Sequence, residues 1–309
     1  MYDFVSKKYW FFLISIVIMV VGVVFVALGG IEPGIEFDGG LRLRLHFDNE
    51  AVTQGQLEEA LVSYGHDDAL VQKLEDHGQF TVHIKEPKTI AEENALMQYL
   101  TSELGEVTVE SRGIVSPLIA SETVRNAAIA VVIAALAILL YVTFAFRKMP
   151  NPFRYGVCGI VALVHDVLIT VGVFAILGFA FNWEVNPMFV TAVLAVIGYS
   201  VNDTIVVFDR IRENQSRGTS SDFQTTVNIS LTQTLARSLC TSITTVVVVS
   251  ALYLFVGGDI RNFVVTLLIG VLAGTYSSIF IASQLLVVWE EDKWRKYVPA
   301  VPVLKKLRA

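Results

Sequence analysis

Six long apolar segments constrain the fold of this chain more than any other feature. They lie at about residues 9–29, 124–146, 155–179, 187–209, 234–256 and 262–288. Each is close to or above the roughly 20 residues that an α-helix needs to cross the hydrocarbon core of a bilayer. Only 17% of the 309 residues are charged, against about 25% in an ordinary soluble domain. The sequence therefore predicts an α-helical polytopic membrane protein with six transmembrane helices.

The first apolar segment is predicted to stay in the mature protein as a transmembrane helix. It follows Lys7 and Lys8 and runs from Trp10 to Leu28. A signal peptide usually has a shorter apolar core and a small-residue cleavage site. This segment instead has the length of a membrane span.

Lysine and arginine are distributed unevenly between the two sides of the membrane. Among the short loops of one side, Arg261 is the basic residue. The other side would carry Lys7, Lys8, Arg147, Lys148, Arg154, Arg210, Arg212, Arg217, Lys293, Arg295, Lys296, Lys305, Lys306 and Arg308. Because cytoplasmic loops are enriched in Lys and Arg, this asymmetry predicts that both termini are cytoplasmic.

The polar stretch between the first two apolar segments is long enough to form a domain. Residues 31–125 hold 18 acidic and 7 basic residues, whereas the whole chain has a net charge of −6. A long domain can be translocated despite its own charges. We therefore predict four parts: a cytoplasmic N-terminus with the first transmembrane helix (1–30), an extracytoplasmic domain (31–123), transmembrane helices two to six (124–289) and a cytoplasmic tail (290–309).

Periodicity within this polar stretch predicts a small α+β domain. Alternating apolar residues indicate strands at 41–47 and 80–84, and shorter strands are expected at 69–74 and 107–111. Helical spacing indicates helices at 53–65 and 89–105, with Thr53 and Thr89 as N-caps and Gly105 as a stop. The order βαββαβ is typical of a ferredoxin-like fold.

The sequence lacks the residues that several classes of function require. Cys158 and Cys240 both lie in apolar segments, so the polar domain has no disulfide framework and no cysteine metal site. The five histidines show no ligand spacing, and the sequence contains neither a phosphate-binding loop nor a basic stripe. We therefore expect no cofactor, no metal, no nucleotide, no nucleic acid and no enzymatic activity.

One carboxylate, Asp203, lies inside an apolar segment, where it is costly unless it is paired, protonated or facing water. Arg237 lies in the next segment. At 1.5 Å per residue, the two groups are roughly 25 and 30 Å from the outer boundary. They would then lie at similar depth on adjacent helices, where an ion pair would offset much of the desolvation cost.

Polar residues also follow one face of the fifth apolar segment. Because these residues lie one to two turns apart, they form a stripe that should face protein or water instead of lipid. The stripe consists of Arg237, Thr241, Thr244 and Thr245, and the apolar Val248 continues the same face.

Two further polar or small-residue patterns occur in the membrane segments. Asp166 and Thr170 are four residues apart in the third segment and share a helix face, with His165 beside them. Gly270 and Gly274 have the GxxxG spacing that permits close contact between helices.

Proton carriage and static packing both explain these groups. An aspartate that exchanges protons needs one environment that favours its charge and one that opposes it, and a movable arginine provides that difference. Alternatively, Arg237 extends to the cytoplasmic surface, Asp203 bonds to helix neighbours, and His165 with Asp166 is structural. Composition does not separate a proton relay from a static salt bridge.

The chain resembles the SecF family of protein-export membrane subunits, which belong to bacterial SecDF complexes within the RND superfamily. The resemblance covers nearly the whole chain. In the exported domain it is carried by "GIEFDGG" (34–40), in which Asp38 stands where a small neutral residue is more usual, and this leaves the role of residue 38 open. In the membrane part it is carried by "ALVHDV" (162–167), "VIGYSVNDTIVVFDRIREN" (196–214), "SLTQTLARSLCTSITT" (230–245), "LYLF" (252–255) and "IGVLAGTYSSI" (269–279).

The resemblance implies a function in protein export. It implies one RND-type half that pairs with a SecD-like subunit in the bacterial inner membrane and uses the proton-motive force to help preproteins leave the SecYEG channel. Protons and membrane lipid are then further partners. The family's membrane aspartate, arginine and threonine fall on Asp203, Arg237 and Thr241, and its glycine turn falls on Gly39 and Gly40.

Two other functions compete with this one. The chain could be half of an RND-type exporter of small molecules or lipids, although such exporters usually carry larger exported domains than the roughly 95 residues expected here. It could also be a scaffold in which the buried charges only fix helix packing.

Overall fold

The computed structural model describes residues 3–49, 51–67, 69–74, 78–84, 90–181, 183–256 and 259–290. These residues contain six helices that are long and apolar enough to cross a membrane, as the sequence predicts. They are α1 (Lys8–Ala27), α5 (Pro117–Ala145), α6 (Pro152–Phe181), α7 (Pro187–Ser216), α8 (Phe223–Tyr253) and a last helix built from α9 (Asp259–Ser277), the π-helical turn η1 (Ser278–Ala282) and α10 (Ser283–Glu290). The predicted C-terminal tail, apart from its first residue, Glu290, lies outside the described residues.

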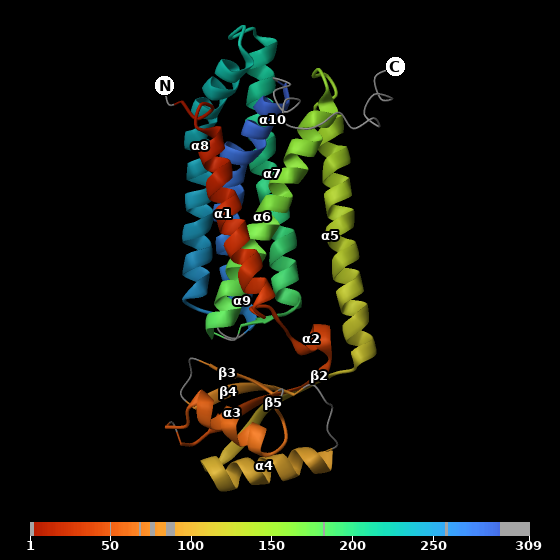
Figure 1. Cartoon of the computed structure of the whole chain (residues 1–309), viewed down its shortest axis with the longest axis vertical. Helices are drawn as coiled ribbons and strands as arrows, with labels where there is room; N and C mark the ends of the chain where they lie inside the picture. Colours follow the sequence, from red (N-terminus) through yellow and green to blue (C-terminus); the bar gives the residue numbers. More distant parts are fainter. Residues whose placement is uncertain are drawn as a thin grey trace.

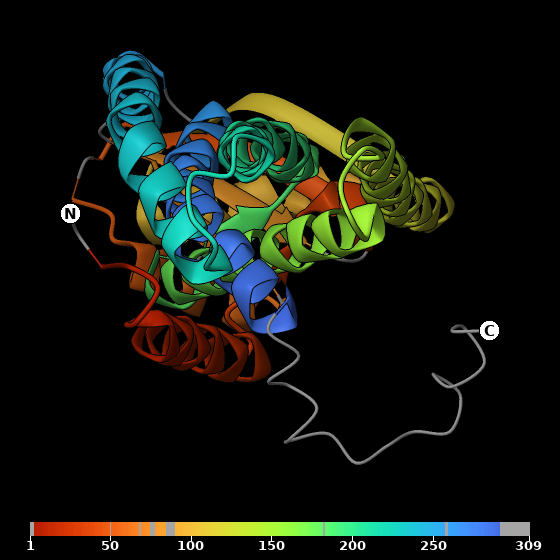
Figure 2. The same ribbon diagram turned by 90° about the horizontal axis from the view of Figure 1, so that it is seen from above.

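The last helix forms the centre of the bundle. It packs against α6, α7 and α8, and it is the most buried of the six membrane-length helices (Figures 1 and 2). Helices α1 and α5 pack on α6 and leave most of their apolar residues on the outer surface. This is the arrangement expected in lipid, where the outside of the bundle can be as apolar as its core.

Capped first turns mark where three of the long helices begin, and α5 and α8 begin before the predicted apolar segments. Proline is the first residue of α5 and of α7, where its missing N–H costs nothing. Ser116 and Asn186 cap these two helices, and Asp222 caps α8 by accepting a 2.9 Å hydrogen bond from the Thr225 amide. Helix α7 also continues past the predicted end at residue 209 to Ser216.

The polar region between α1 and α5 forms the predicted βαββαβ unit at one end of the bundle (Figure 1). Its four strands are antiparallel in the order β3-β4-β2-β5, which is the ferredoxin-like order. The elements are β2 (Gly40–Phe47), α3 (Gln54–Ser63), β3 (Leu70–Lys73), β4 (Gln79–Ile84), α4 (Ile90–Leu104) and β5 (Val107–Val115). The fold-class prediction is confirmed.

Alternation along β2 builds the core of this domain. Leu41, Leu43, Leu45 and Phe47 are fully buried on the sheet face that α3 and α4 cover, whereas the intervening residues point toward the bundle. Thr53 makes a full capping box at α3, as predicted. The predicted cap of α4 at residue 89 lies outside the described residues.

A short junction ties this domain to the loop between α6 and α7. Strand β1 (Glu32–Pro33) pairs in parallel with β6 (Glu184–Val185). The Glu184 carboxylate accepts a 3.2 Å charged hydrogen bond from Arg42, which also makes a 3.1 Å ion pair with Glu36. His83 lies 3.7 Å from the same Glu184 carboxylate. The domain is therefore held to the bundle by buried and half-buried charges.

Candidate functional site

Asp203 projects from α7 into the bundle and is 7% exposed. One carboxylate oxygen, Oδ1, accepts a 2.7 Å hydrogen bond from Ser238 of α8. The other, Oδ2, accepts a 2.6 Å hydrogen bond from Ser278, the first residue of η1. Hydroxyl groups from two neighbouring helices therefore solvate this buried carboxylate.

The predicted ion pair between Asp203 and Arg237 is not formed within the described part of the chain. Arg237 lies on the exposed face of α8, whereas the next residue, Ser238, is fully buried and bonds to Asp203. Consecutive residues of an α-helix are about 100° apart, so Ser238 and Arg237 point in different directions. Thr241 lies on the same exposed face as Arg237. Similar depth in the membrane did not bring the two charges together, because the rotation of α8 decides which side chain faces α7.

The predicted polar stripe of α8 lies on the outside of this chain. Thr241, Thr244 and Thr245 donate hydrogen bonds of 2.9–3.0 Å to carbonyls of their own helix. The buried face of α8 carries a second row of hydroxyl residues that the sequence reasoning missed, although its strict spacing of four could have shown it. This row consists of Ser230, Thr234, Ser238 and Ser242.

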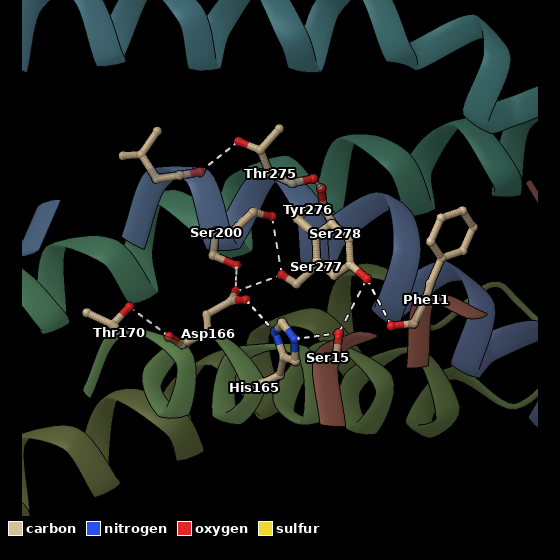
Figure 3. Close-up of polar contacts among 12 residues, drawn as sticks. Phe11, Ser15, His165, Asp166, Thr170, Ser200, Thr275, Tyr276, Ser277 and Ser278 are labelled. Atoms are coloured by element: carbon tan, nitrogen blue, oxygen red, sulfur yellow. Dashed lines mark hydrogen bonds and ion pairs between the residues drawn. The ribbon is translucent and has the colours of Figure 1, made fainter. Parts of the chain in front are cut away.

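A second carboxylate is buried more deeply than Asp203. Asp166 of α6 has no exposed surface, and its Oδ2 accepts hydrogen bonds from Ser200 at 2.5 Å and from Ser277 at 2.7 Å. Its Oδ1 lies 3.0 Å from Nδ1 of His165. Figure 3 shows His165 and Asp166 side by side, with the serines converging on the carboxylate from α7 and α9.

Hydroxyl groups extend this cluster to α1. Nε2 of His165 lies 3.0 Å from Oγ of Ser15, and the Ser15 hydroxyl is 3.4 Å from the Tyr276 hydroxyl. Tyr276 in turn donates a 2.9 Å hydrogen bond to the Phe11 carbonyl (Figure 3). Thr170 shares the face of Asp166 but donates to its backbone carbonyl at 2.7 Å, so it does not touch the carboxylate.

The two glycines of the GxxxG pattern make the close helix contact that the spacing permits, and the helix met is α7. A Cβ on Gly274 would lie 2.9 Å from Cβ of Ser200, and one on Gly270 would lie 2.1 Å from a methyl group of Val196. The helices can approach this closely only because both positions lack a side chain. This contact holds Ser200 and Ser277 at hydrogen-bonding distance from Asp166.

The glycine pair at the start of the exported domain makes a sharp change of direction. Gly39 and Gly40 have φ angles of +82° and +124°, which residues with a side chain rarely adopt. A Cβ on Gly39 would also lie 3.2 Å from the backbone of Pro117. The turn therefore places the end of α2 (Ile35–Asp38) next to the first residue of α5.

The side chains gathered in the core of the bundle are of kinds that can bind or relay a proton. Each of the two carboxylates is held by hydroxyl donors, and one of them also faces an imidazole. Within the part of the chain that the structure describes, no three His, Cys, Asp or Glu side chains gather as they would around a metal ion. A carboxylate in such a site can change its charge by binding a proton, while the hydroxyl groups reorient.

Comparisons with known proteins all find similarity to protein-export membrane proteins. A family model described as "Protein export membrane protein SecD/SecF, C-terminal" matches residues 96–292. The chain is 45% identical over 300 residues to the protein translocase subunit SecF of Thermobaculum terrenum, a match that covers 94% of each chain. It is also 40% identical over 301 residues to SecF of Anaerolinea thermophila, with 96% of this chain and 97% of that one covered.

Longer relatives contain a region like this chain together with further sequence. The SecDF subunit of Bacillus subtilis is 34% identical over 302 residues, and the match covers 96% of this chain but 39% of the relative. The crystal structure of SecDF from Thermus thermophilus matches with a TM-score of 0.82 and 33% identity, and it covers 94% of this chain. The chain spans 39% of the length of that structure.

Proposed function

The chain belongs to the SecD/SecF family of protein export membrane proteins, and we propose that it uses the proton-motive force to promote preprotein export. As a SecF-like translocase subunit it has an auxiliary role in Sec-dependent translocation. It is a multi-pass membrane protein. In this function a SecD-like subunit is its partner, and the preprotein leaves the SecYEG channel with its help.

The observation that carries the proposal is the environment of Asp203. The carboxylate lies within a membrane-length helix, is nearly inaccessible and is hydrogen-bonded by Ser238 and Ser278 in place of a cation. A paired cation would need the carboxylate to stay charged, whereas the two serine hydroxyl groups can donate to it or turn away from it. A proton that crosses a potential of 100 mV releases about 2.3 kcal/mol, enough to bias a two-state equilibrium about 50-fold.

Arg237 and Thr241 act in this proposal at the boundary with the partner. Both are exposed on α8 in this chain, and the longer SecDF relatives contain further sequence that could cover this face. An arginine at membrane depth needs an anionic partner or water. We therefore place the anionic partner of Arg237 on the SecD-like half. Arg237 itself lies on α8 next to Ser238, the serine that binds Asp203.

The proposed topology follows from the positions of the basic residues. The domain of residues 31–123 lies on the outer side of the bacterial inner membrane, and both termini are cytoplasmic. The ferredoxin-like unit sits at one end of the bundle, and the loop between α7 and α8, which follows Arg217, lies at the opposite end (Figure 1). This separation supports an outward-facing domain and a cytoplasmic loop between α7 and α8.

Asp203→Asn tests the proposal because it keeps the shape of the side chain and removes its titration. Proton-dependent stimulation of export should be lost, while protein level and SecD binding remain. The matched control is Asp209→Asn on the same helix, because the Asp209 side chain is 53% exposed and pairs with Arg212 at 2.5 Å. The assay is export of a reporter preprotein into inverted membrane vesicles, with and without a proton gradient.

Arg237→Lys keeps the charge but loses the planar fork of the guanidinium, so a partial or full defect is expected. If Asp203→Asn vesicles respond to the gradient as fully as the Asp209→Asn control, Asp203 is a structural carboxylate and the proton-carrier role is wrong. The exporter alternative is not favoured, because the relatives described above are translocase subunits.

A further inference from the structure

The membrane core holds a buried His–Asp pair that the Asp203 site does not include. We propose that His165 and Asp166 form a second proton-binding site, coupled to Asp203 through the adjacent serines Ser277 and Ser278. This inference rests on the proposed function, in which Asp203 carries the driving proton. It adds a site that binds and releases one proton within the same bundle.

The geometry around Asp166 is that of a carboxylate sharing a proton. Oδ2 accepts two hydroxyl hydrogen bonds, and the second oxygen, Oδ1, faces Nδ1 of His165 at 3.0 Å. Asp166 has no exposed surface and His165 is 6% exposed. At this distance a bare imidazole nitrogen and a bare carboxylate oxygen would repel each other. One proton must therefore lie between Nδ1 and Oδ1.

The hydroxyl chain on the other side of His165 gives the pair two satisfied states. The Phe11 carbonyl can only accept, so the Tyr276 hydroxyl donates to it. When Ser15 donates to Tyr276, the Ser15 oxygen accepts from an Nε2–H of His165. The imidazole then has a proton at Nε2, another proton lies between Nδ1 and Oδ1, and the pair as a whole is neutral.

Rotation of one hydroxyl group accommodates the loss of a proton. If the pair releases a proton, His165 keeps Nδ1–H toward Asp166, and Nε2 becomes an acceptor. The Ser15 hydroxyl can then turn from Tyr276 and donate to Nε2, at the cost of its 3.4 Å hydrogen bond to the Tyr276 hydroxyl. Ser15 can therefore hydrogen-bond to Nε2 of His165 both before and after the pair releases its proton. The pair is thus suited to exchange a proton rather than to hold it permanently.

Consecutive serines connect this pair to Asp203. Ser277 donates to Asp166, and Ser278 donates to Asp203. Each serine also has a carbonyl of its own helix within reach, at 3.2 Å for Ser277 and 3.1 Å for Ser278. A carboxylate needs fewer hydroxyl donors when it binds a proton itself, as at Asp203, or when the imidazole beside it becomes charged, as at Asp166. Proton binding at either site therefore frees one serine to bond to its own helix. The π-helical turn η1 begins at Ser278, where the regular ladder of the last helix is already interrupted.

The described groups that face His165 and Asp166 from the neighbouring helices are uncharged. Tyr276 of α9 stacks on the imidazole with a centroid distance of 6.1 Å, α1 contributes Ser15, and α7 contributes Ser200. Among the described residues, no lysine or arginine forms an ion pair with Asp166. The nearest carboxylate in the network is Asp203, which is reached through the two serines.

Infrared difference spectroscopy between low and high pH tests the proposal on the purified complex with its SecD-like partner in lipid. An Asp203→Asn complex should still show a titrating band from a buried carboxyl or imidazole group. Adding Asp166→Asn should remove that band, and adding His165→Gln should shift or remove it. Adding Thr170→Val, which loses a hydroxyl group one turn away that bonds only to a backbone carbonyl, should leave the band unchanged.

The function is measured separately by gradient-driven export with Asp203 intact. Asp166→Asn and His165→Gln should each reduce the stimulation several-fold, and Thr170→Val should not. If the band persists in both double variants, or if neither His165→Gln nor Asp166→Asn reduces stimulation, the pair is structural and the inference is wrong. The spectra use the Asp203→Asn background, so a failure of the Asp203 proposal would not remove this signal.

Discussion

Helices α1 and α6 touch so closely that one added methyl group should destabilise the protein. A Cβ on Gly172 would lie 2.8 Å from the Cα of Gly22, and a Cβ on Gly22 would lie 2.6 Å from the Cα of Gly172. Both obstacles are backbone atoms, so no side-chain rotation relieves the contact. Since carbon atoms prefer separations of about 3.5 Å or more, Gly172→Ala should push α1 outward by about 0.7 Å.

The expected energy follows from two opposing effects. Overpacking of this kind costs about 1–3 kcal/mol, and alanine in a helix gains up to about 1 kcal/mol over glycine. The matched control is Gly198→Ala in α7, because a Cβ there would meet no atom within 4 Å. The control should show only the gain, so the unfolding free energies of the two variants should differ by about 1–3 kcal/mol.

Cys158 provides the assay. It is 1% exposed, whereas the other cysteine, Cys240, is exposed. In a Cys240→Ser background, a fluorogenic maleimide therefore reports thermal unfolding in detergent through the exposure of Cys158. Gly172→Ala should lower the unfolding midpoint below that of Gly198→Ala. An equal or higher midpoint for Gly172→Ala would show that α1 is not seated on α6 as described.

The same displacement should reach the His165 pair. Ser15 lies seven residues before Gly22, and His165 lies seven residues before Gly172, so both pairs of positions are two turns along helices in contact. An outward shift of α1 would lengthen the present 3.0 Å contact between Ser15 and Nε2 of His165. Gly172→Ala should therefore also weaken gradient-driven export, whereas Gly198→Ala tests whether any added methyl group does so.

Two further predictions concern the exported domain. Arg42→Ala leaves the buried Glu184 carboxylate without its guanidinium partner. Hydrogen-exchange mass spectrometry should then show faster amide exchange in residues 31–36, where the Gly34 amide donates to the Val185 carbonyl. The control is Arg44→Ala on the same strand face, which should change this exchange little because Arg44 makes no ion pair among the described residues. A cysteine at Gln79 in a cysteine-free chain should react with an impermeant reagent from outside the cell, whereas a cysteine at Thr219 should react only after the membrane is opened; the reverse pattern would overturn the proposed orientation.

Local patterns in the sequence determined the elements of this protein. The length of each apolar segment gave six membrane helices, because a helix must satisfy its backbone within one segment to cross a bilayer. Alternation and capping residues gave the βαββαβ order, because the two faces of a strand and the ends of a helix have local chemical requirements. The GxxxG pattern also predicted a close contact, although not that Ser200 and Val196 would be the residues met.

The tertiary structure decided which polar groups meet. The sequence showed Asp203, Arg237 and Asp166 as unusual, but it paired Asp203 with the arginine, whereas the fold pairs it with Ser238 and Ser278. Whether Arg237 or Ser238 faces Asp203 depends on a rotation of α8 by one residue. The sequence of α8 alone does not fix that rotation. It depends on the packing of α8 against α7 and α9.

The two serines of the last helix show most clearly that the sequence alone does not predict which polar groups meet. In the sequence, Ser277 and Ser278 are two small residues in an apolar stretch. In the fold they face different helices and bind two different carboxylates, Asp166 and Asp203. The length and polarity of a segment determine that it enters the membrane, but a hydrogen bond between segments depends on depth, rotation and distance at once, and these quantities are fixed only when all the helices pack together.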